Sequence, residues 1–192
     1  MVTRVQLEHA VRAAERVLRD HGVVEPGLLI LGSQAVLGTW DADRLPEIVT
    51  LSEEVDVCPL GDDDAESLAT LLDAVLGEWS PFHEAHDFYV QGVGSRTATL
   101  PTGWEKRLLT VVDSSGSGAT ALCLEATDLC AAKLVAGREK DYEYVSALVT
   151  AGLVDPRLLD ERVRTLPDGV RDRVAGWTGA LVRRCGDEQP RR

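Results

Sequence analysis

The sequence contains no long apolar run, and no stretch approaches the roughly 20 consecutive apolar residues that a transmembrane helix needs. Its first residues lead into an amphipathic pattern, which differs from the apolar core of a signal peptide. We therefore expect a soluble, cytoplasmic protein that does not associate with membranes. With 192 residues, 44% of them hydrophobic, the chain is long enough to bury a core as one compact unit.

The sequence also lacks paired cysteines, since its four cysteines are widely and irregularly spaced and form no C-x-x-C motif. This spacing favours neither a disulfide framework nor a structural zinc site, so buried, reduced thiols are the simpler interpretation. His83 and His86 have i,i+3 spacing and an acidic neighbour, but no helical pattern surrounds them. We therefore expect a loop at these histidines and no metal site.

Positive charge is scarce over most of the chain. The net charge of −12 opposes nonspecific binding of nucleic acids, because an acidic protein repels a polyanion. Residues 157–192 are the exception: nine arginines and six acidic residues give them a net charge of +3, whereas residues 1–156 carry −15. Two interpretations stay open, namely a solvated amphipathic surface or a landing site for an anionic polymer such as RNA.

Hydrophobic periodicity and turn residues predict an α+β fold, in which a mixed central sheet is flanked by helices and further helices collect at the carboxyl end. In this scheme residues 1–126 form the α/β core, and residues 127–192 form a helical region packed on it. A capping box of Thr3 and Gln6 opens the first helix, whose buried stripe is expected to include Val5. The first expected elements are a helix over 3–20, a strand over 27–31, a short helix over 33–38, a loop over 40–47 and a strand within 49–60 that ends at Pro59. A helix follows that starts with a capping box of Asp63 and Glu66 and ends at Gly77, and after it come a strand over 88–93 and a hairpin of strands 108–112 and 119–124. The chain then continues with helices over 127–137 and 138–151, a helix that begins at Pro156, and a last helix around 170–181.

Two carboxylates alternate along the strand expected within 49–60. Glu54 and Asp56 are two residues apart, so they lie on one face of a strand, roughly 6.5–7 Å from each other. Such a pair can converge on a hard cation, and Mg²⁺ binds in proteins through one or two carboxylates together with water and substrate phosphate oxygens. The pair by itself is also compatible with an exposed sheet face that carries acidic residues.

A Gly-Ser turn follows the strand expected over 27–31. Gly32 permits a close approach of the backbone to a ligand, and the amides of the following short helix, with the Ser33 hydroxyl, can donate to a phosphate. The order of strand, Gly-Ser, short helix, loop and acidic strand would put phosphate donors and metal ligands on adjacent strands. Phosphoryl-group transfer requires that arrangement.

These motifs resemble the nucleotidyltransferase superfamily related to DNA polymerase beta, whose minimal signature is Gly-Ser followed at a distance by acid-x-acid. Residues 97–104 with Arg107, residues 123–129 and the block 133–141 are similar to a family of small bacterial nucleotidyltransferase-like proteins of undefined function. That family is akin to the nucleotidyltransferase toxins of toxin–antitoxin and phage-defence pairs. The resemblance implies a polymerase-beta-like core, a nucleoside triphosphate substrate, a Mg²⁺ or Mn²⁺ cofactor, and a cognate antitoxin or a second copy of the chain as partner.

The same resemblance implies roles in the block 133–141. Lys133 binds the triphosphate and Asp141 supports the site, while Arg138 and Lys140 join the nucleotide-binding residues. If one helix continues through this block, positions 133, 137, 140 and 141 lie along one face and Lys133 and Asp141 both look at the cleft. The alternative is a solvated charged face with an i,i+3 pair of Arg138 and Asp141.

The chain departs from the superfamily pattern in its carboxylates. Glu54 stands where Asp is usual, and the third carboxylate of many active relatives has no clear match, since Asp87 precedes the strand expected over 88–93 and Gln91 lies within it. Residues 97–104 could form a loop over the cleft or a packed corner, and we favour the packed corner.

The sequence thus predicts a metal-dependent nucleotidyltransferase whose catalytic residues are Glu54, Asp56, Lys133 and Asp141. It would transfer a nucleoside monophosphate to an RNA 3′ end, a protein side chain or a small molecule, and could serve as a toxin or defence component. Only the arginine-rich carboxyl-terminal helices favour RNA. The competing hypothesis is a catalytically inactive relative that acts as a binding or regulatory protein.

Overall fold

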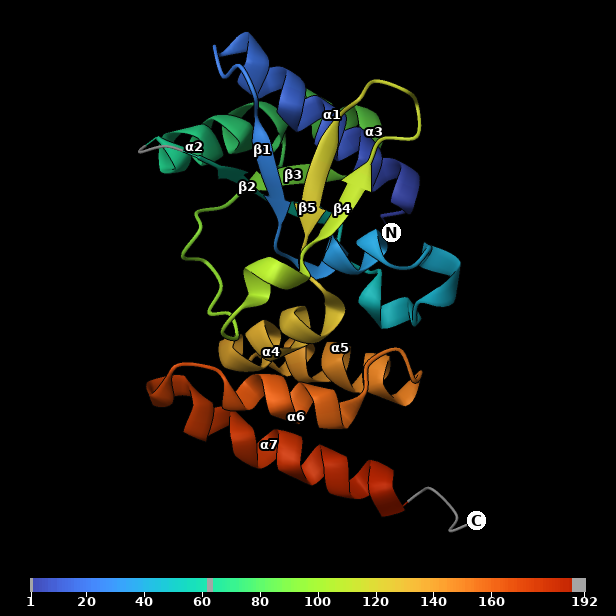
Figure 1. The fold of residues 1–192 in the computed structure, drawn as a ribbon. Helices are drawn as coiled ribbons and strands as arrows, with labels where there is room; N and C mark the ends of the chain where they lie inside the picture. Colours follow the sequence, from blue (N-terminus) through green and yellow to red (C-terminus); the bar gives the residue numbers. More distant parts are fainter. Residues whose placement is uncertain (1, 62–63, 188–192) are drawn as a thin grey trace.

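A five-stranded mixed sheet forms the centre of the protein, as the sequence predicts (Figure 1). The computed structural model describes residues 2–61 and 64–187. The strands are β1 (Gly27–Ile30), β2 (Glu54–Leu60), β3 (Tyr89–Gly92), β4 (Leu109–Val112) and β5 (Thr120–Cys123). They lie in the order β3-β2-β1-β5-β4. The central strand β1 runs antiparallel to β2 and parallel to β5, while the pair β2–β3 is parallel and the hairpin β4–β5 antiparallel.

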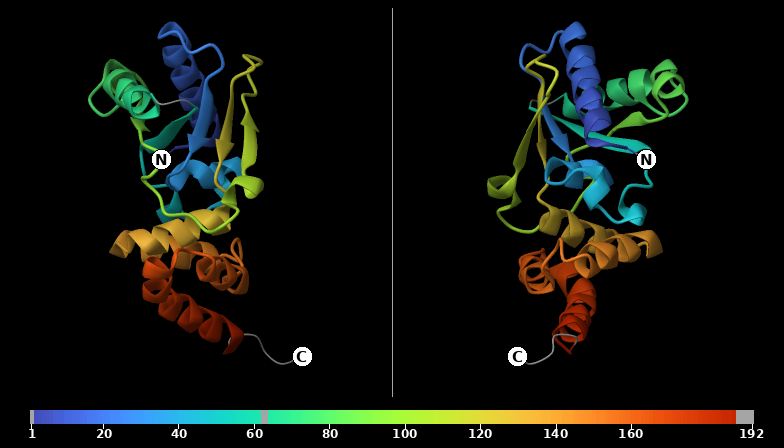
Figure 2. Two further views of the ribbon diagram at one scale, coloured as in Figure 1. Left: turned by 60° about the vertical axis from the view of Figure 1, so that its left-hand side comes forward. Right: turned by 90° about the vertical axis from the view of Figure 1, so that its right-hand side faces the viewer.

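The helices form two groups: one covers a face of the sheet, and the other lies below the lower ends of the strands (Figures 1 and 2). The first group comprises α1 (Arg4–Asp20), α2 (Ala65–Leu76) and α3 (Pro81–His86). The second group comprises α4 (Ala126–Ala136), α5 (Glu139–Thr150), α6 (Pro156–Arg164) and α7 (Asp168–Asp187). Short 3₁₀-helices η1 (Ser33–Gly38), η2 (Ala42–Arg44), η3 (Glu47–Val49) and η4 (Trp104–Arg107) lie in the connections. This architecture confirms the predicted α+β fold with a helical carboxyl end.

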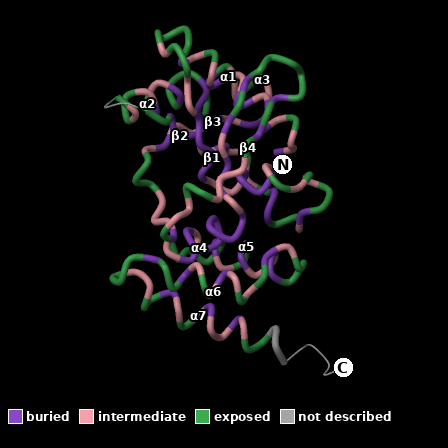
Figure 3. Tube along the Cα trace, viewed as in Figure 1, coloured by how far each residue is buried: buried purple, intermediate pink, exposed green. Residues whose placement is uncertain are grey.

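One hydrophobic core runs through both groups of helices. Ile30 and Val57 of the sheet belong to the same buried cluster as Leu129 of α4 and Leu148 of α5. Leu159 of α6 extends this cluster toward α7, whose outer side faces solvent (Figure 3). None of the helices traced over 2–61 and 64–187 is long and apolar enough to cross a membrane.

Helix α1 confirms the predicted capping box but corrects its predicted stripe. The Thr3 side chain accepts from the Gln6 amide, and the Gln6 side chain accepts from the Thr3 amide. Leu7, Val11 and Leu18 are buried, whereas Val5 is 69% exposed. Val5 precedes Leu7 by two positions, or about 200° around a helix, so it points away from the sheet.

Four further predictions of local structure were wrong or lie outside the described residues. Residues 81–86 form a helix instead of a loop, because Ser80 caps the His83 amide and Pro81 occupies the first turn. The loop expected over 40–47 contains η2 and the start of η3. Strand β2 continues past Pro59 to Leu60, since β3 pairs with it only as far as Val57 and leaves one side without a partner. The capping box predicted at Asp63 lies outside the described residues.

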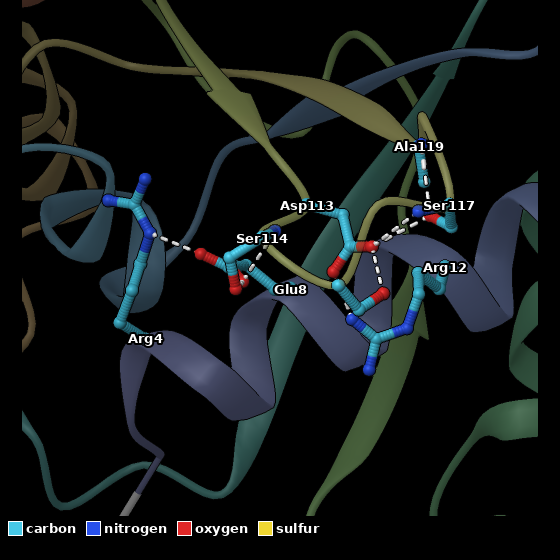
Figure 4. Close-up of polar contacts among 8 residues, drawn as sticks. Arg4, Glu8, Arg12, Asp113, Ser114, Ser117 and Ala119 are labelled. Atoms are coloured by element: carbon cyan, nitrogen blue, oxygen red, sulfur yellow. Dashed lines mark hydrogen bonds and ion pairs between the residues drawn. The ribbon is translucent and has the colours of Figure 1, made fainter.

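The predicted serine-glycine turn between β4 and β5 is tied to α1 (Figure 4). Asp113 accepts hydrogen bonds from Ser115 and Ser117 within the turn, and it forms an ion pair with Arg12 of α1. Glu8 of α1 accepts a hydrogen bond of 3.0 Å from the Ser114 amide. These contacts fix the hairpin turn against α1, at the end of the sheet opposite α4 and α5 (Figure 1).

Candidate active site

One cavity of about 690 Å³ lies between the sheet and helices α4 and α5. All the residues that the sequence nominates for nucleotide, metal or catalytic roles line it. Gly32, Ser33, Glu54 and Asp56 come from the end of β1, the start of η1 and strand β2, whereas Lys133, Arg138, Lys140 and Asp141 come from the α4–α5 block. The fold therefore joins two halves of a site that are about 100 residues apart in the chain.

Gly32 and Asp56 pack against each other where β1 ends and β2 begins. The Leu31 amide donates to the Asp56 carbonyl oxygen over 3.2 Å, which holds the two segments side by side. A Cβ atom at position 32 would lie 1.6 Å from Oδ2 of Asp56, a distance that no side chain tolerates. Glycine is needed here because the Asp56 carboxylate lies over the turn.

Glu54 and Asp56 share the face of β2 that lines the cavity, while Val55 and Val57 between and after them are fully buried on the opposite face. Tyr89 of β3 donates its hydroxyl to Oε2 of Glu54 over 3.3 Å. Burial and the negative charge of Glu54 raise the pKa of Asp56 to about 6. Two mutually repelling carboxylates at the wall of the cavity form a fitting donor set for one divalent cation, whose charge would relieve the repulsion.

Lys133 reaches from α4 to the Gly-Ser turn. Its Nζ donates to Oγ of Ser33 over 3.0 Å and lies 3.4 Å from Oδ1 of Asp141. The same ammonium group lies 4.3 Å from the centre of the Tyr144 ring, and the Tyr144 hydroxyl donates to the Ser33 carbonyl oxygen over 2.7 Å. Burial lowers the pKa of Lys133, although the Asp141 carboxylate opposes this effect. Lys133, Tyr144 and Ser33 thus form one contact group at the Gly-Ser turn.

Asp141 is fully buried and holds the α4–α5 junction together. Its Oδ2 accepts from Nε of Arg138 over 2.7 Å and from the Arg138 amide over 3.3 Å. Burial by itself would raise the pKa of Asp141, but the hydrogen bond from Arg138 and the charges of Lys133 and Arg138 outweigh it, so the pKa is lowered. The Asp141 carboxylate is therefore the shared counter-charge of Lys133 and Arg138.

The structure confirms the two helices expected over 127–137 and 138–151, so the condition of one continuous helix through the block 133–141 is not met. Gly137 ends α4 in the left-handed conformation with φ of 69°, and α5 starts after Arg138, which serves as its N-cap residue. Glycine after the last helical turn favours such an end. Lys133 and Asp141 meet across this helix–helix junction and not along one helical face. The i,i+3 pair of Arg138 and Asp141 from the alternative interpretation forms, but it is not part of a solvated face, since Asp141 is fully buried.

Among the residues that the structure describes, no third carboxylate lies next to Glu54 and Asp56 in the site. In the parallel pair β2–β3, Asp56 stands opposite Gln91, whose side chain lines the cavity. Asp87 ends α3 in an exposed position and does not line the cavity. Within the described ranges 2–61 and 64–187, no three histidine, cysteine or acidic side chains are grouped so that they could hold a metal ion.

Several residues of the cavity were missed or misjudged from the sequence. Thr97 and Thr99 line it, so the preference for a packed corner was wrong for the start of the segment 97–104, although Pro101 is buried. Tyr144 was missed, yet it lies three positions after Asp141, on the same face of α5. Ile48 and Leu51 contribute an apolar rim on the connection that precedes β2.

A protein-family model described as "Nucleotidyltransferase of unknown function (DUF6036)" matches residues 6–172 of the chain. The matched region includes the Gly-Ser turn, the carboxylates of β2 and the whole α4–α5 block. No curated protein and no solved structure matches the chain.

Proposed function

Because the chain belongs to this family of nucleotidyltransferases of unknown function, we propose that it transfers a nucleoside monophosphate from a nucleoside triphosphate to an acceptor hydroxyl with the help of a divalent cation. The observation that carries the proposal is one cavity in which the Gly-Ser turn, a pair of carboxylates and three cationic side chains meet. Its volume of about 690 Å³ falls within the range usual for small-molecule sites.

The charges of the cavity walls suggest how a triphosphate would lie. Glu54 and Asp56 on β2 would hold Mg²⁺ or Mn²⁺, while Lys133, Arg138 and Lys140 on the opposite wall would contact phosphate oxygens. The bound cation would supply positive charge to the phosphates and to the leaving pyrophosphate. Lys133 would exchange its hydrogen bond with Ser33 for a phosphate oxygen and would keep Asp141 as its counter-charge.

Isothermal titration with each of the four nucleoside triphosphates tests the binding step. Binding is expected in the presence of Mg²⁺ and should weaken at least tenfold in the double variant Glu54→Ala, Asp56→Ala. The double variant Glu25→Ala, Glu105→Ala is a matched control for a general loss of two negative charges, because both residues are exposed and lie outside the cavity. No binding at millimolar nucleotide by the folded chain would rule the proposal out.

The acceptor is proposed only as a class that bears a hydroxyl group: an RNA 3′ end, a protein side chain or a small molecule. Several arginines of the carboxyl-terminal helices are engaged within the chain: Arg164 pairs with Asp160 at 2.8 Å, and Arg173 donates to the Val135 carbonyl oxygen over 2.7 Å. If RNA is the acceptor, its binding should weaken steeply with salt, and Arg157→Gln with Arg183→Gln should reduce that salt dependence. RNA binding that is insensitive to salt would exclude RNA as the acceptor.

A second candidate function is a catalytically inactive binding or regulatory protein, including the partner of a toxin–antitoxin pair. Gln91 opposite Asp56 favours it, because active relatives often carry a third carboxylate in this region. Expression of the chain with and without the substitutions Glu54→Ala and Asp56→Ala separates the two functions. Growth arrest that the double variant abolishes would support a toxic transferase, whereas an effect that persists would support the binding role.

A further inference from the structure

The register of strands β2 and β3 bears on how many cations the site holds. Asp56 pairs with Gln91, and Glu54 pairs with Tyr89, in a parallel ladder. Residues paired in this way point to the same face of a sheet, on strands about 4.8 Å apart. Gln91 therefore occupies the position from which a third carboxylate would face Asp56 across the cavity wall, and its own side chain lines that cavity.

We infer that the site holds a single divalent cation and that the neutral side chain of Gln91 is the feature that limits it to one. This inference rests on the proposed function, because it concerns the cation that Glu54 and Asp56 would hold. It differs from the arrangement in which two cations, about 3.5–4 Å apart, clamp the attacking and leaving oxygens. In such an arrangement we expect the second ion to need an anionic ligand from the protein beyond Glu54 and Asp56.

No other acidic residue of the described site can take the place of the missing carboxylate. Asp141 is fully buried and committed to Arg138 and Lys133. Asp87 is exposed at the end of α3 and lies outside the cavity. Glu143 lines the cavity, but it is an exposed residue of α5, across the cavity from β2. The two acids of β2 therefore face the cation without a third anionic ligand.

The charges around the two carboxylates agree with one cation. Lys133, Arg138 and Lys140 all act on Asp56 as positive charges. One divalent ion balances Glu54 and Asp56, whereas a second ion would meet these cationic side chains with only an amide oxygen from Gln91 to receive it. Repulsion between the two ions, close together in a partly buried cavity, would then have no counter-charge from the protein.

Counting bound Mn²⁺ tests this inference. The folded chain is dialysed to equilibrium against Mn²⁺ with a saturating α,β-methylene nucleoside triphosphate, which cannot transfer its nucleotide, and protein-bound Mn²⁺ is counted by electron paramagnetic resonance. The wild-type chain should bind one Mn²⁺ for each bound nucleotide. Gln91→Asp and Gln91→Glu should each raise the count to two, because either restores an anionic ligand opposite Asp56.

Two control variants separate the effect of a carboxylate at position 91 from the effects of a changed side-chain size and of negative charge added elsewhere in the cavity. Gln91→Asn should keep the count at one, since it changes the size of the side chain but not its charge. Thr99→Asp adds a carboxylate to the cavity wall outside the β2–β3 ladder and should also leave the count at one. Circular dichroism confirms that each variant is folded before its ions are counted.

The results distinguish a failure of the single-cation inference from a failure of the proposed function. Two Mn²⁺ ions in the wild-type complex, or a count that stays at one in both folded acidic variants, would overturn the single-cation inference and leave the proposed function intact. A wild-type chain that binds neither Mn²⁺ nor nucleotide would overturn the proposed function, and the inference with it.

Discussion

The Asp56 carboxylate fills the space that a side chain at Gly32 would need, since a Cβ atom there would lie 1.6 Å from Oδ2 of Asp56. The two motifs that nominate the site, Gly-Ser and acid-x-acid, are therefore in direct steric contact. This relationship explains why glycine and aspartate occur together here: the turn must be free of a side chain so that the carboxylate can stand at the cavity wall.

Gly32→Ala should displace the Asp56 carboxylate and destabilise the fold by roughly 1–3 kcal/mol, the usual cost of an overpacked site. Thermal unfolding and Mn²⁺ titration measure the two effects. In the background of Asp56→Gly the same substitution should cost much less, because every atom of Asp56 within 3 Å of the added Cβ is gone. Gly94→Ala is the control, since a Cβ there would come no closer than 3.9 Å to any neighbour. Equal costs in both backgrounds would contradict the proposed clash.

Lys133→Met should abolish most of the binding of nucleoside triphosphate and leave the fold nearly intact. The Asp141 carboxylate keeps its 2.7 Å hydrogen bond with Arg138 in this variant, so no buried charge is left unpaired. We expect the dissociation constant measured by titration to rise at least tenfold, with little change in melting temperature. Asp141→Asn should instead lower the melting temperature, because it leaves Lys133 and Arg138 without their shared counter-charge.

The local parts of the fold and of the site were predictable, because they depend on neighbouring residues. The alternation of Glu54 and Asp56 follows from the period of a strand, and the capping box of Thr3 and Gln6 follows from the geometry of a helix start. The break at Gly137 also has a local signal, since glycine commonly ends a helix. The two separate helices expected there were correct, and the argument from one shared face does not apply, since it required a helix that continues through that glycine.

The long-range parts were not predictable from residue patterns. The contact of Lys133 with Ser33 joins positions about 100 residues apart, and only the resemblance to a family pointed to it. The pairing of Asp56 with Gln91 depends on the register of two strands, which packing of Val55 and Val90 in the core decides. Such contacts follow from the tertiary structure and leave no signal in a local window of sequence.

The pKa of Asp56, about 6 against an ordinary value of 3.8, predicts a pH dependence of stability in the absence of metal. The folded chain then holds this proton more tightly than the unfolded chain between pH 3.8 and 6. The contribution of Asp56 to the free energy of unfolding should therefore fall as the pH rises through this window, by up to about 3 kcal/mol. Urea titrations at pH 4 and 7 should show Asp56→Asn gaining stability relative to wild type at pH 7. A constant difference would contradict the prediction.

Tyr89→Phe should weaken the binding of Mn²⁺ without unfolding the chain. The Tyr89 hydroxyl donates to Oε2 of Glu54 over 3.3 Å and so restricts the carboxylate before a cation binds. Loss of one such hydrogen bond costs about 1 kcal/mol, which corresponds to a roughly fivefold weaker affinity. Tyr142→Phe removes a hydroxyl from α5 and should leave the affinity for Mn²⁺ unchanged. An equal effect of both substitutions would exclude a specific role of Tyr89.

The pair of Arg107 and Asp128 should stabilise the junction between the sheet and the lower helices. Two nitrogens of Arg107, before β4, donate to the fully buried Asp128 carboxylate of α4 over 2.7 and 3.0 Å. Asp128→Asn should destabilise the chain by about 3 kcal/mol, because Arg107 loses its counter-charge in a partly buried place.

Arg96→Met tests whether the loss of any ion pair would destabilise the chain as Asp128→Asn does. Arg96 pairs with Glu66 at 3.1 Å, and both side chains are largely exposed. Solvent and salt screen such a surface pair, so its loss should not change the urea midpoint measurably. The double variant Arg107→Met, Asp128→Asn should be less destabilised than the sum of its single variants, because the two side chains act as one unit. Strictly additive losses, or a loss in Asp128→Asn no larger than in Arg96→Met, would show that the pair does not hold α4 against the sheet.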